Sequence, residues 1–229
     1  MSPAAAGEVR RTPRSRATRR RTQWLGALPL IACAGIAWGD ANLESALQAS
    51  LAGQPPELVQ KLVEEKIVLL PGSDADPHEP GRVRALVLFS QPRRRVVELL
   101  IQTARQIEYR TDLEDLKTVE RLPDHNVDEH DMKIMLMRIS YWLRYQWDLQ
   151  AGRISWSLDS RFPNQLRVAE GSWDLGELDA DHTLARFATR IDVGPALPSF
   201  LQELATRKNL PTTLDRCRRW VDSDGRYRP

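Results

Sequence analysis

The sequence predicts an α+β fold in which a curved antiparallel sheet wraps around a long C-terminal helix. The chain has 229 residues, of which 41% are hydrophobic and 28% are charged, a composition usual for globular domains. Between residues 116 and 193, short runs that alternate apolar and polar side chains are separated by polar turns, which indicates about six antiparallel strands. Residues 198–224 then carry apolar side chains at helical spacing, which predicts the covering helix.

The first 39 residues are expected to be an export leader. An Arg-rich stretch precedes the apolar run of residues 24–38, which is too short to span a bilayer but has the layout of a bacterial secretory signal. Two processing sites remain open: ordinary signal-peptidase cleavage near Gly39, or a lipobox in which Cys33 becomes a lipidated anchor. An uncleaved anchor is a third alternative. We therefore expect a periplasmic or extracellular protein.

The positive charge of the chain belongs to this leader. Seven of the 33 Lys and Arg residues and one acid, Glu8, lie in residues 1–39, which leaves 26 basic and 30 acidic residues, a net charge of −4, in the rest. Binding to nucleic acid needs clustered basic residues, so no nucleic-acid partner is expected. With Cys33 in the leader, Cys217 lacks a partner for a disulfide.

Residues 40–60 are expected to form a short helical lead-in, with Leu43, Leu47 and Leu51 at a spacing of four. Residues 66–72 and 83–91 are short apolar runs around a turn-rich segment, and they indicate a first pair of strands. Residues 90–110 return to a helical period and predict a short helix pair after these strands. Its first turn holds Arg93, Arg94 and Arg95, which either form a solvated face or make transient contact with a membrane surface.

The middle strands are read as "LKTVERL", "MKIMLMRI", "SYWLRYQWDLQ", "RISWSLDS", "NQLRVAEGSWDLG" and "TLARFATRIDV". In the fifth, apolar side chains change from even to odd positions, and a bulge near Glu170 and Gly171 would reconcile them. The polar segment 123–131, with His125 and His130, is expected to be a solvent-facing turn rather than a metal site. No metal or cofactor is expected.

The last helix carries Leu210, Leu214, Cys217 and Val221 on one stripe, so Cys217 is expected to be a small buried hydrophobe. Pro211 is expected to divide or restart this helix. The domain boundaries follow as a leader over 1–39, the lead-in over 40–60, the main domain over 61–222 and a disordered tail over 223–229.

Several segments together resemble the START-like or SRPBCC superfamily with its helix-grip fold, in the coenzyme-Q-binding and polyketide-cyclase-like branch. The resemblance rests on "FSQPRRRVVELLIQ", "RISWSLD", "EGSWDL", "TLARFATRIDVG", "PALPSFL" and "LPTTLDRCRRWV", and it covers roughly residues 60–222. It implies an apolar cavity between the sheet and the C-terminal helix, of the kind that holds lipids, isoprenoid quinones or polyketides.

The first interpretation is therefore an exported, non-enzymatic protein that binds a lipid or a quinone-like isoprenoid. Its candidate pocket residues are inward-facing aromatic and apolar side chains: Tyr145, Trp147, Trp156, Trp173, Phe187, Ile191, Phe200 and Leu204. Two alternatives stay open. A cyclase- or hydrolase-type enzyme would need a buried titratable group facing the cavity, although no catalytic residue is indicated. A filled-core interaction module would pack its aromatic side chains so tightly that no cavity remains. The sequence does not indicate the oligomeric state.

Overall fold

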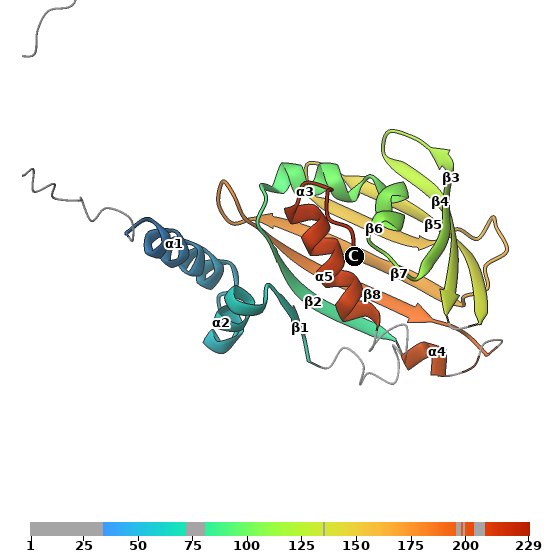
Figure 1. Cartoon of the computed structure of the whole chain (residues 1–229), viewed down its shortest axis with the longest axis horizontal. Helices are drawn as coiled ribbons and strands as arrows, with labels where there is room; N and C mark the ends of the chain where they lie inside the picture. Colours follow the sequence, from blue (N-terminus) through green and yellow to red (C-terminus); the bar gives the residue numbers. More distant parts are fainter. Residues whose placement is uncertain (1–33, 72–80, 135, 196–197, 199, 204–208) are drawn as a thin grey trace, which may run out of the picture.

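The computed structural model describes residues 34–71, 81–134, 136–195, 198, 200–203 and 209–229. The elements follow one another in an order close to the predicted one (Figure 1). They are α1 (Ala34–Ser50), α2 (Pro56–Glu65), β1 (Ile67–Leu69), β2 (Arg82–Phe89), α3 (Arg93–Leu100), the 3-10 helix η1 (Thr103–Glu108), β3 (Leu113–Arg121), β4 (His125–Ile134), β5 (Met137–Asp148), β6 (Arg153–Leu158), β7 (Val168–Glu177), β8 (Thr183–Asp192), α4 (Phe200–Glu203) and α5 (Asn209–Asp222).

The strands form one eight-stranded sheet in the order β1-β2-β8-β7-β6-β5-β4-β3, with every neighbouring pair antiparallel. The sheet curves, and α5 lies across its inner face with α3 and η1 beside it (Figure 1). The predicted α+β architecture and the short helix pair after the first strands are thereby confirmed.

The inner face of β8 matches the predicted alternation. Ala185, Phe187, Thr189 and Val193 are buried, and Ile191 is half-buried. Two apolar clusters cover the inner face of the sheet. One joins β2, β7 and β8 to α3 and α5, and the other lies on β4, β5 and the start of β7. The predicted stripe of α5 faces the first cluster, because Leu210, Leu214, Cys217 and Val221 are all buried.

A third apolar cluster lies on the outer face of the sheet. Leu43, Leu47 and Leu51 of α1 and its C-terminal turn, together with Leu62 of α2, pack against outward-facing side chains of β2 and β8 such as Leu88. The predicted helical lead-in is therefore a second layer on this half of the sheet, and α2 continues past residue 60 to Glu65. Among the described helices, none is long and apolar enough to cross a membrane.

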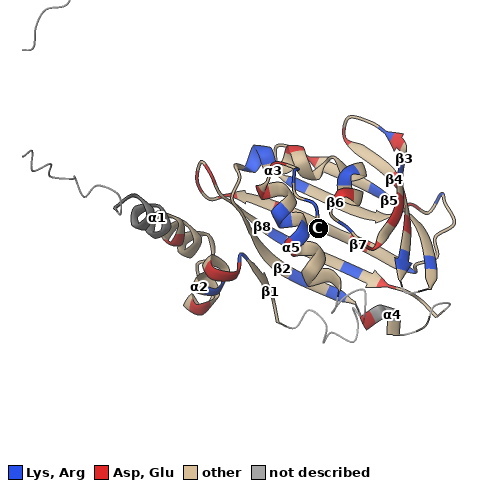
Figure 2. Ribbon diagram, viewed as in Figure 1, with Lys and Arg blue, Asp and Glu red and all other residues tan. Residues whose placement is uncertain are grey.

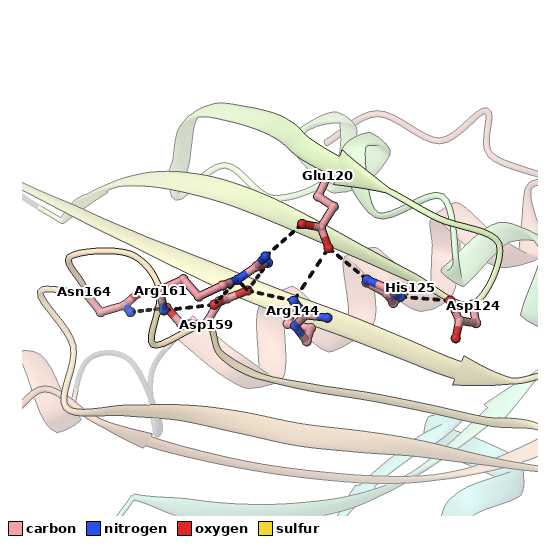
Figure 3. A network of polar contacts seen from close by, with 7 residues as sticks. All are labelled: Glu120, Asp124, His125, Arg144, Asp159, Arg161 and Asn164. Atoms are coloured by element: carbon pink, nitrogen blue, oxygen red, sulfur yellow. Dashed lines mark hydrogen bonds and ion pairs between the residues drawn. The ribbon is translucent and has the colours of Figure 1, made fainter.

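A network of charged side chains lies on the other half of the outer face. Glu120 on β3 contacts three cations, Arg144 on β5, Arg161 in the loop after β6, and His125 on β4 when that imidazole is protonated (Figure 3). Arg161 and Arg144 also bind the carboxylate of Asp159. This network links three strands and one loop.

The predicted turn over residues 123–131 is shorter in the structure. The chain reverses between Arg121 and His125, where the Leu122 N–H donates to the His125 carbonyl, and His125–Ile134 is the strand β4. A second reversal follows between β4 and β5, where Leu136 is 98% exposed. The expected strand "MKIMLMRI" is therefore two strands. Alternation along β4 sends His125 to the outer face and His130 to the buried inner face, so the two histidines do not share a site.

The predicted bulge in β7 is also wrong. The pairing of β7 with β8 runs without a shift from Val168 to Glu177. Leu166 lies before the strand begins, so its even position does not belong to the strand's alternation. Gly171 instead makes room for the Trp156 ring, because a Cβ atom at this position would lie 2.3 Å from that ring. The indole needs a residue without a side chain beneath it.

The helix pair begins with the three arginines, as predicted (Figure 2). Arg94 pairs with Glu98, Arg95 pairs with Glu98 and Asp224, and Arg93 donates to the carbonyl of Gln150. Contact of this face with a membrane stays a prediction. Pro211 lies in the first turn of α5, where its missing N–H costs no hydrogen bond.

The last seven residues, expected to be disordered, make specific contacts instead. Arg228 pairs with Glu108, and Arg105 donates to the carbonyl of Gly225. The side chain of Tyr227 packs against the first inner cluster. These contacts fasten the end of α5 to η1. Residues 1–33, which include Cys33 and most of the expected leader, and residues 72–80 lie outside the described residues.

Candidate ligand-binding site

A cavity of about 160 Å³ lies between α5 and the inner face of the sheet, where the two inner clusters meet. Most of its wall is apolar, and a few polar groups gather at η1 and the start of β3. The lining residues are Leu100, Gln106, Tyr109, Arg110, Asp112, Met132, Ile134, Ile139, Tyr141, Leu143, Tyr145, Ile154, Trp156, Leu166, Ala169, Trp173, Phe187, Thr189, Ile191, Val193, Asn209, Leu210, Thr213, Leu214 and Cys217.

Five of the eight residues proposed from the sequence line this cavity: Tyr145, Trp156, Trp173, Phe187 and Ile191. That they contact a ligand stays a prediction.

The other three candidates do not belong to the described cavity wall. Trp147 shares the inner face of β5, but it lies near the strand end, and its indole N–H donates to the carbonyl of Pro123. Phe200 is on α4, is 49% exposed and is not among the residues that line the cavity. Leu204 lies outside the described residues.

Aromatic rings form a continuous series across the inner face. Trp173 contacts both Phe89 and Phe187, with ring centroids 6.0 and 4.5 Å apart, and Phe187 contacts Trp156 at 5.8 Å. Trp156 in turn lies 6.2 Å from Tyr145. The rings meet at tilted angles typical of aromatic packing. Although Trp156 and Trp173 both contact Phe187, as expected of a filled core, a cavity remains beside them.

The polar end of the cavity is built around Arg110. Its Nε and Nη2 donate to the Asp112 carboxylate at 3.3 and 2.7 Å, and its Nη1 donates to the Gln106 side-chain oxygen at 3.2 Å. The two charged side chains are only 16% and 18% exposed. Burial opposes both charges, but their mutual attraction prevails: it holds the pKa of Arg110 above its ordinary value and the pKa of Asp112 below it.

The sequence did not indicate Arg110 or Asp112 as site residues. Both come from the irregular connection between η1 and β3, and no periodic pattern shows which way such side chains point. The only sequence feature that could have indicated this ion pair is the spacing of Arg110 and Asp112, which lie on either side of Thr111.

His130 lies behind the cavity wall and was missed because β4 was assigned as a turn. Its ring stacks on Tyr141, with centroids 5.1 Å apart. Burial, together with the nearby charge of Arg110, lowers the pKa of His130 to about 3, so the imidazole is neutral. The Tyr145 hydroxyl accepts from Gln106 Nε2 at 3.0 Å and lies 3.4 Å from His130 Nε2. Burial raises the pKa of Tyr145, so this hydroxyl keeps its proton.

Cys217 lines the cavity from α5. Burial raises the pKa of its thiol to about 12, and the Tyr109 hydroxyl interacts with it. A thiol with so high a pKa is not a nucleophile at neutral pH, which agrees with its expected role as a small buried hydrophobe.

No protein-family model matches this chain, and no curated protein matches its sequence. Solved structures are similar at low identity. A protein from Thermus thermophilus has a TM-score of 0.53 and 18% identity, covering 62% of this chain and 97% of that one. A STAR-related lipid transfer protein from Xanthomonas axonopodis has a TM-score of 0.53 and 16% identity, covering 69% and 94%. The Zhui aromatase/cyclase from a Streptomyces species has a TM-score of 0.50 and 17% identity, covering 63% and 97%. These similarities, with the strand order and the position of α5, show that the chain has the START-like helix-grip fold.

Proposed function

We propose that this protein binds a hydrophobic small molecule in the cavity between the sheet and α5. The observation that carries the proposal is the cavity itself. Its wall is mostly apolar, so a ligand that buries apolar surface there gains about 25 cal/mol for each Å² removed from water. Solved relatives named for lipid transfer and for aromatase/cyclase activity support the same assignment.

The size of the cavity favours a ring over a whole lipid. An engineered cavity of roughly 150 Å³ encloses benzene, and pockets for drug-sized ligands are roughly 300–1,000 Å³. A space of about 160 Å³ therefore suits one ring or a compact fused pair. A quinone head group meets this requirement, and an attached isoprenoid chain would extend beyond the cavity.

Fluorescence offers a direct test, because Trp156 and Trp173 line the cavity. We expect 1,4-naphthoquinone to quench the tryptophan emission of the full chain saturably, and native mass spectrometry to show one bound molecule per chain. The absence of both signals across quinones, fatty acids and polycyclic aromatics would contradict the proposal.

The polar end of the cavity also favours a second candidate, an enzyme of the cyclase or hydrolase type. Arg110 and Asp112 are half-buried charged groups that face the cavity, as this alternative requires of at least one titratable group. Recovery of the bound compound after long incubation separates the two candidates. An altered mass would support the enzyme, and an unchanged compound would support the binding protein.

We further propose that the chain is exported. The support is the Arg-rich and apolar layout of residues 1–38. Cell fractionation followed by N-terminal sequencing tests it. A mature chain that begins near Gly39 supports cleavage by signal peptidase. Membrane attachment that Cys33→Ser abolishes supports a lipoprotein. A cytoplasmic chain with its first residues intact would contradict export.

A further inference from the structure

The thioether of Met132 accepts two hydrogen bonds at the polar end of the cavity. The Tyr141 hydroxyl donates to Met132 Sδ at 3.1 Å, and Arg110 Nη2 lies 3.6 Å from the same sulfur. All three side chains line the cavity, and Tyr141 is only 4% exposed. Thioether sulfur is a weak acceptor. A buried and a half-buried donor therefore converge on a sulfur that accepts hydrogen bonds only weakly.

The neighbouring hydroxyl is more firmly engaged. Tyr145 lies between Gln106 and His130, so its oxygen accepts one hydrogen bond and its proton can be donated to the imidazole. The Tyr141 O–H can rotate about its C–O bond at little cost in free energy, because the hydrogen bond that it gives up is a weak one to the Met132 sulfur. Methionine is flexible and adapts its shape to what it contacts. Tyr141 is thus the hydroxyl in this group that a ligand can take over most easily.

The charge at this end of the cavity is balanced. Arg110 is paired through two hydrogen bonds with Asp112, which leaves no net charge for an anion to neutralise. A ligand carboxylate beside Arg110 would also approach the Asp112 carboxylate in a poorly hydrated space, where like charges repel strongly. An uncharged oxygen can accept from Tyr141 and Arg110 without these costs.

Resting on the proposed function, we infer that Tyr141 and Arg110 recognise an uncharged carbonyl oxygen on the ring of the ligand, and that Met132 yields both donors to it. The ligand class is then a cyclic ketone or quinone rather than a hydrocarbon or a carboxylate. The apolar wall encloses the ring, and the two donors fix which edge of it points toward η1.

Three bicyclic compounds on one skeleton test this inference by calorimetry with the full chain: 1-tetralone, tetralin and tetralin-1-carboxylate. We expect 1-tetralone to bind about tenfold more tightly than tetralin, as a net gain of about one to two hydrogen bonds allows. The carboxylate should bind no more tightly than tetralin.

Two variants test whether Tyr141 and Met132 determine the preference for 1-tetralone over tetralin. Tyr141→Phe should reduce the preference for the ketone to about threefold or less and leave the affinity for tetralin within about twofold. Met132→Leu removes the competing acceptor and should increase the preference. Tyr227→Phe makes the same chemical change outside the described cavity wall and should leave the preference unaltered.

The outcomes separate the two proposals. Equal binding of tetralin and 1-tetralone, or tightest binding of the carboxylate, would overturn this inference and leave the proposed function standing. A ketone preference that survives Tyr141→Phe would also overturn it. If Tyr141→Phe does not fold, a smaller preference in Met132→Leu than in the unmodified chain would decide against it. Failure of all three compounds to bind would overturn the proposed function, and the inference with it.

Discussion

Gly171 and Trp156 show how a single residue shapes the cavity wall. They are directly opposite each other on β7 and β6, and the indole lies over the glycine. Because the ring occupies the place of a side chain, it stays close to the sheet and leaves room beside Phe187, which it contacts. The absence of one Cβ atom therefore helps to keep the cavity open.

Gly171→Ala should displace the Trp156 ring and destabilise the protein by about 1–3 kcal/mol, the usual cost of overpacking. The added Cβ would lie 2.3 Å from the ring and 2.5 Å from the carbonyl oxygen of Ala188. Urea denaturation measures the effect. Gly176→Ala on the same strand is the control, since the added Cβ would lie 3.6 Å from the carbonyl oxygen of Leu184, an ordinary van der Waals contact. Equal stability of the two variants would contradict this account of Gly171.

Asp128 is a buried acid on the inner face of β4. Its carboxylate oxygens accept no hydrogen bond of good geometry within the described part of the chain. Burial raises its pKa, and the nearby Thr103 and Thr118 hydroxyls and the charge of Arg121 offset only part of that effect. The folded state therefore holds this proton more tightly than the unfolded chain, so stability falls as pH rises from the ordinary Asp pKa through the raised one.

Asp128→Asn should accordingly raise the melting temperature at pH 7, by about 2–4 °C for each kcal/mol regained. The gain should vanish near pH 3, where the carboxyl is protonated in both states. Calorimetric melting at the two pH values measures it. A variant that is less stable than the unmodified chain at pH 7 would show that the ionised carboxylate is instead well accommodated.

At the scale of elements, β4 places two histidines in opposite environments. His125 faces the outer network, where Asp124 and Glu120 raise its pKa. His130 faces inward, where burial lowers its pKa to about 3. For His125, the stabilisation is complete below the ordinary pKa of about 6.5 and is lost as pH rises through the raised value. For His130, stability is lost as pH falls below about 6.5, because the unfolded chain then takes up the proton.

Two-dimensional NMR of the imidazole groups should show His125 titrating above pH 6.5 and His130 unchanged down to at least pH 5. Glu120→Gln removes one of the two carboxylates that contact His125 (Figure 3) and should lower the pKa of His125 alone. A His130 signal that titrates near pH 6.5 would mean that its ring is not buried against Tyr141 as described.

The strand β4 also shows why alternation of apolar and polar residues does not identify every strand. β8 and β6 were predictable because their apolar residues face one side and their polar residues the other. In β4 the inner face carries Asn126, Asp128 and His130, so polar residues occur on both faces and resemble a turn. What distinguishes this strand is hydrogen bonding to distant partners, such as Asn126 to Thr103, which the local sequence does not encode.

At the scale of the whole molecule, three apolar clusters divide the sheet between them. The α1 and α2 layer covers one half of the outer face, and two clusters share the inner face. The run of antiparallel strands and the covering helix followed from periodicity in the sequence. The cavity did not, because an unfilled space depends on how far apart the two inner clusters lie. Periodicity shows that Phe187 faces inward, but not whether its neighbours fill the space beside it.

The central claim is that the cavity between the sheet and α5 binds the ligand. The most direct test is a substitution that fills this cavity with a larger side chain. Ala169 is 6% exposed, lines the cavity and lies on β7, so leucine at this position would project into the open space. Ala169→Leu should weaken binding of 1,4-naphthoquinone at least about tenfold while the chain stays folded. Ala188→Leu makes the same change on the outer side of β8 and should bind as the unmodified chain does. Undiminished binding by a folded Ala169→Leu variant would contradict the claim that this cavity is the ligand site.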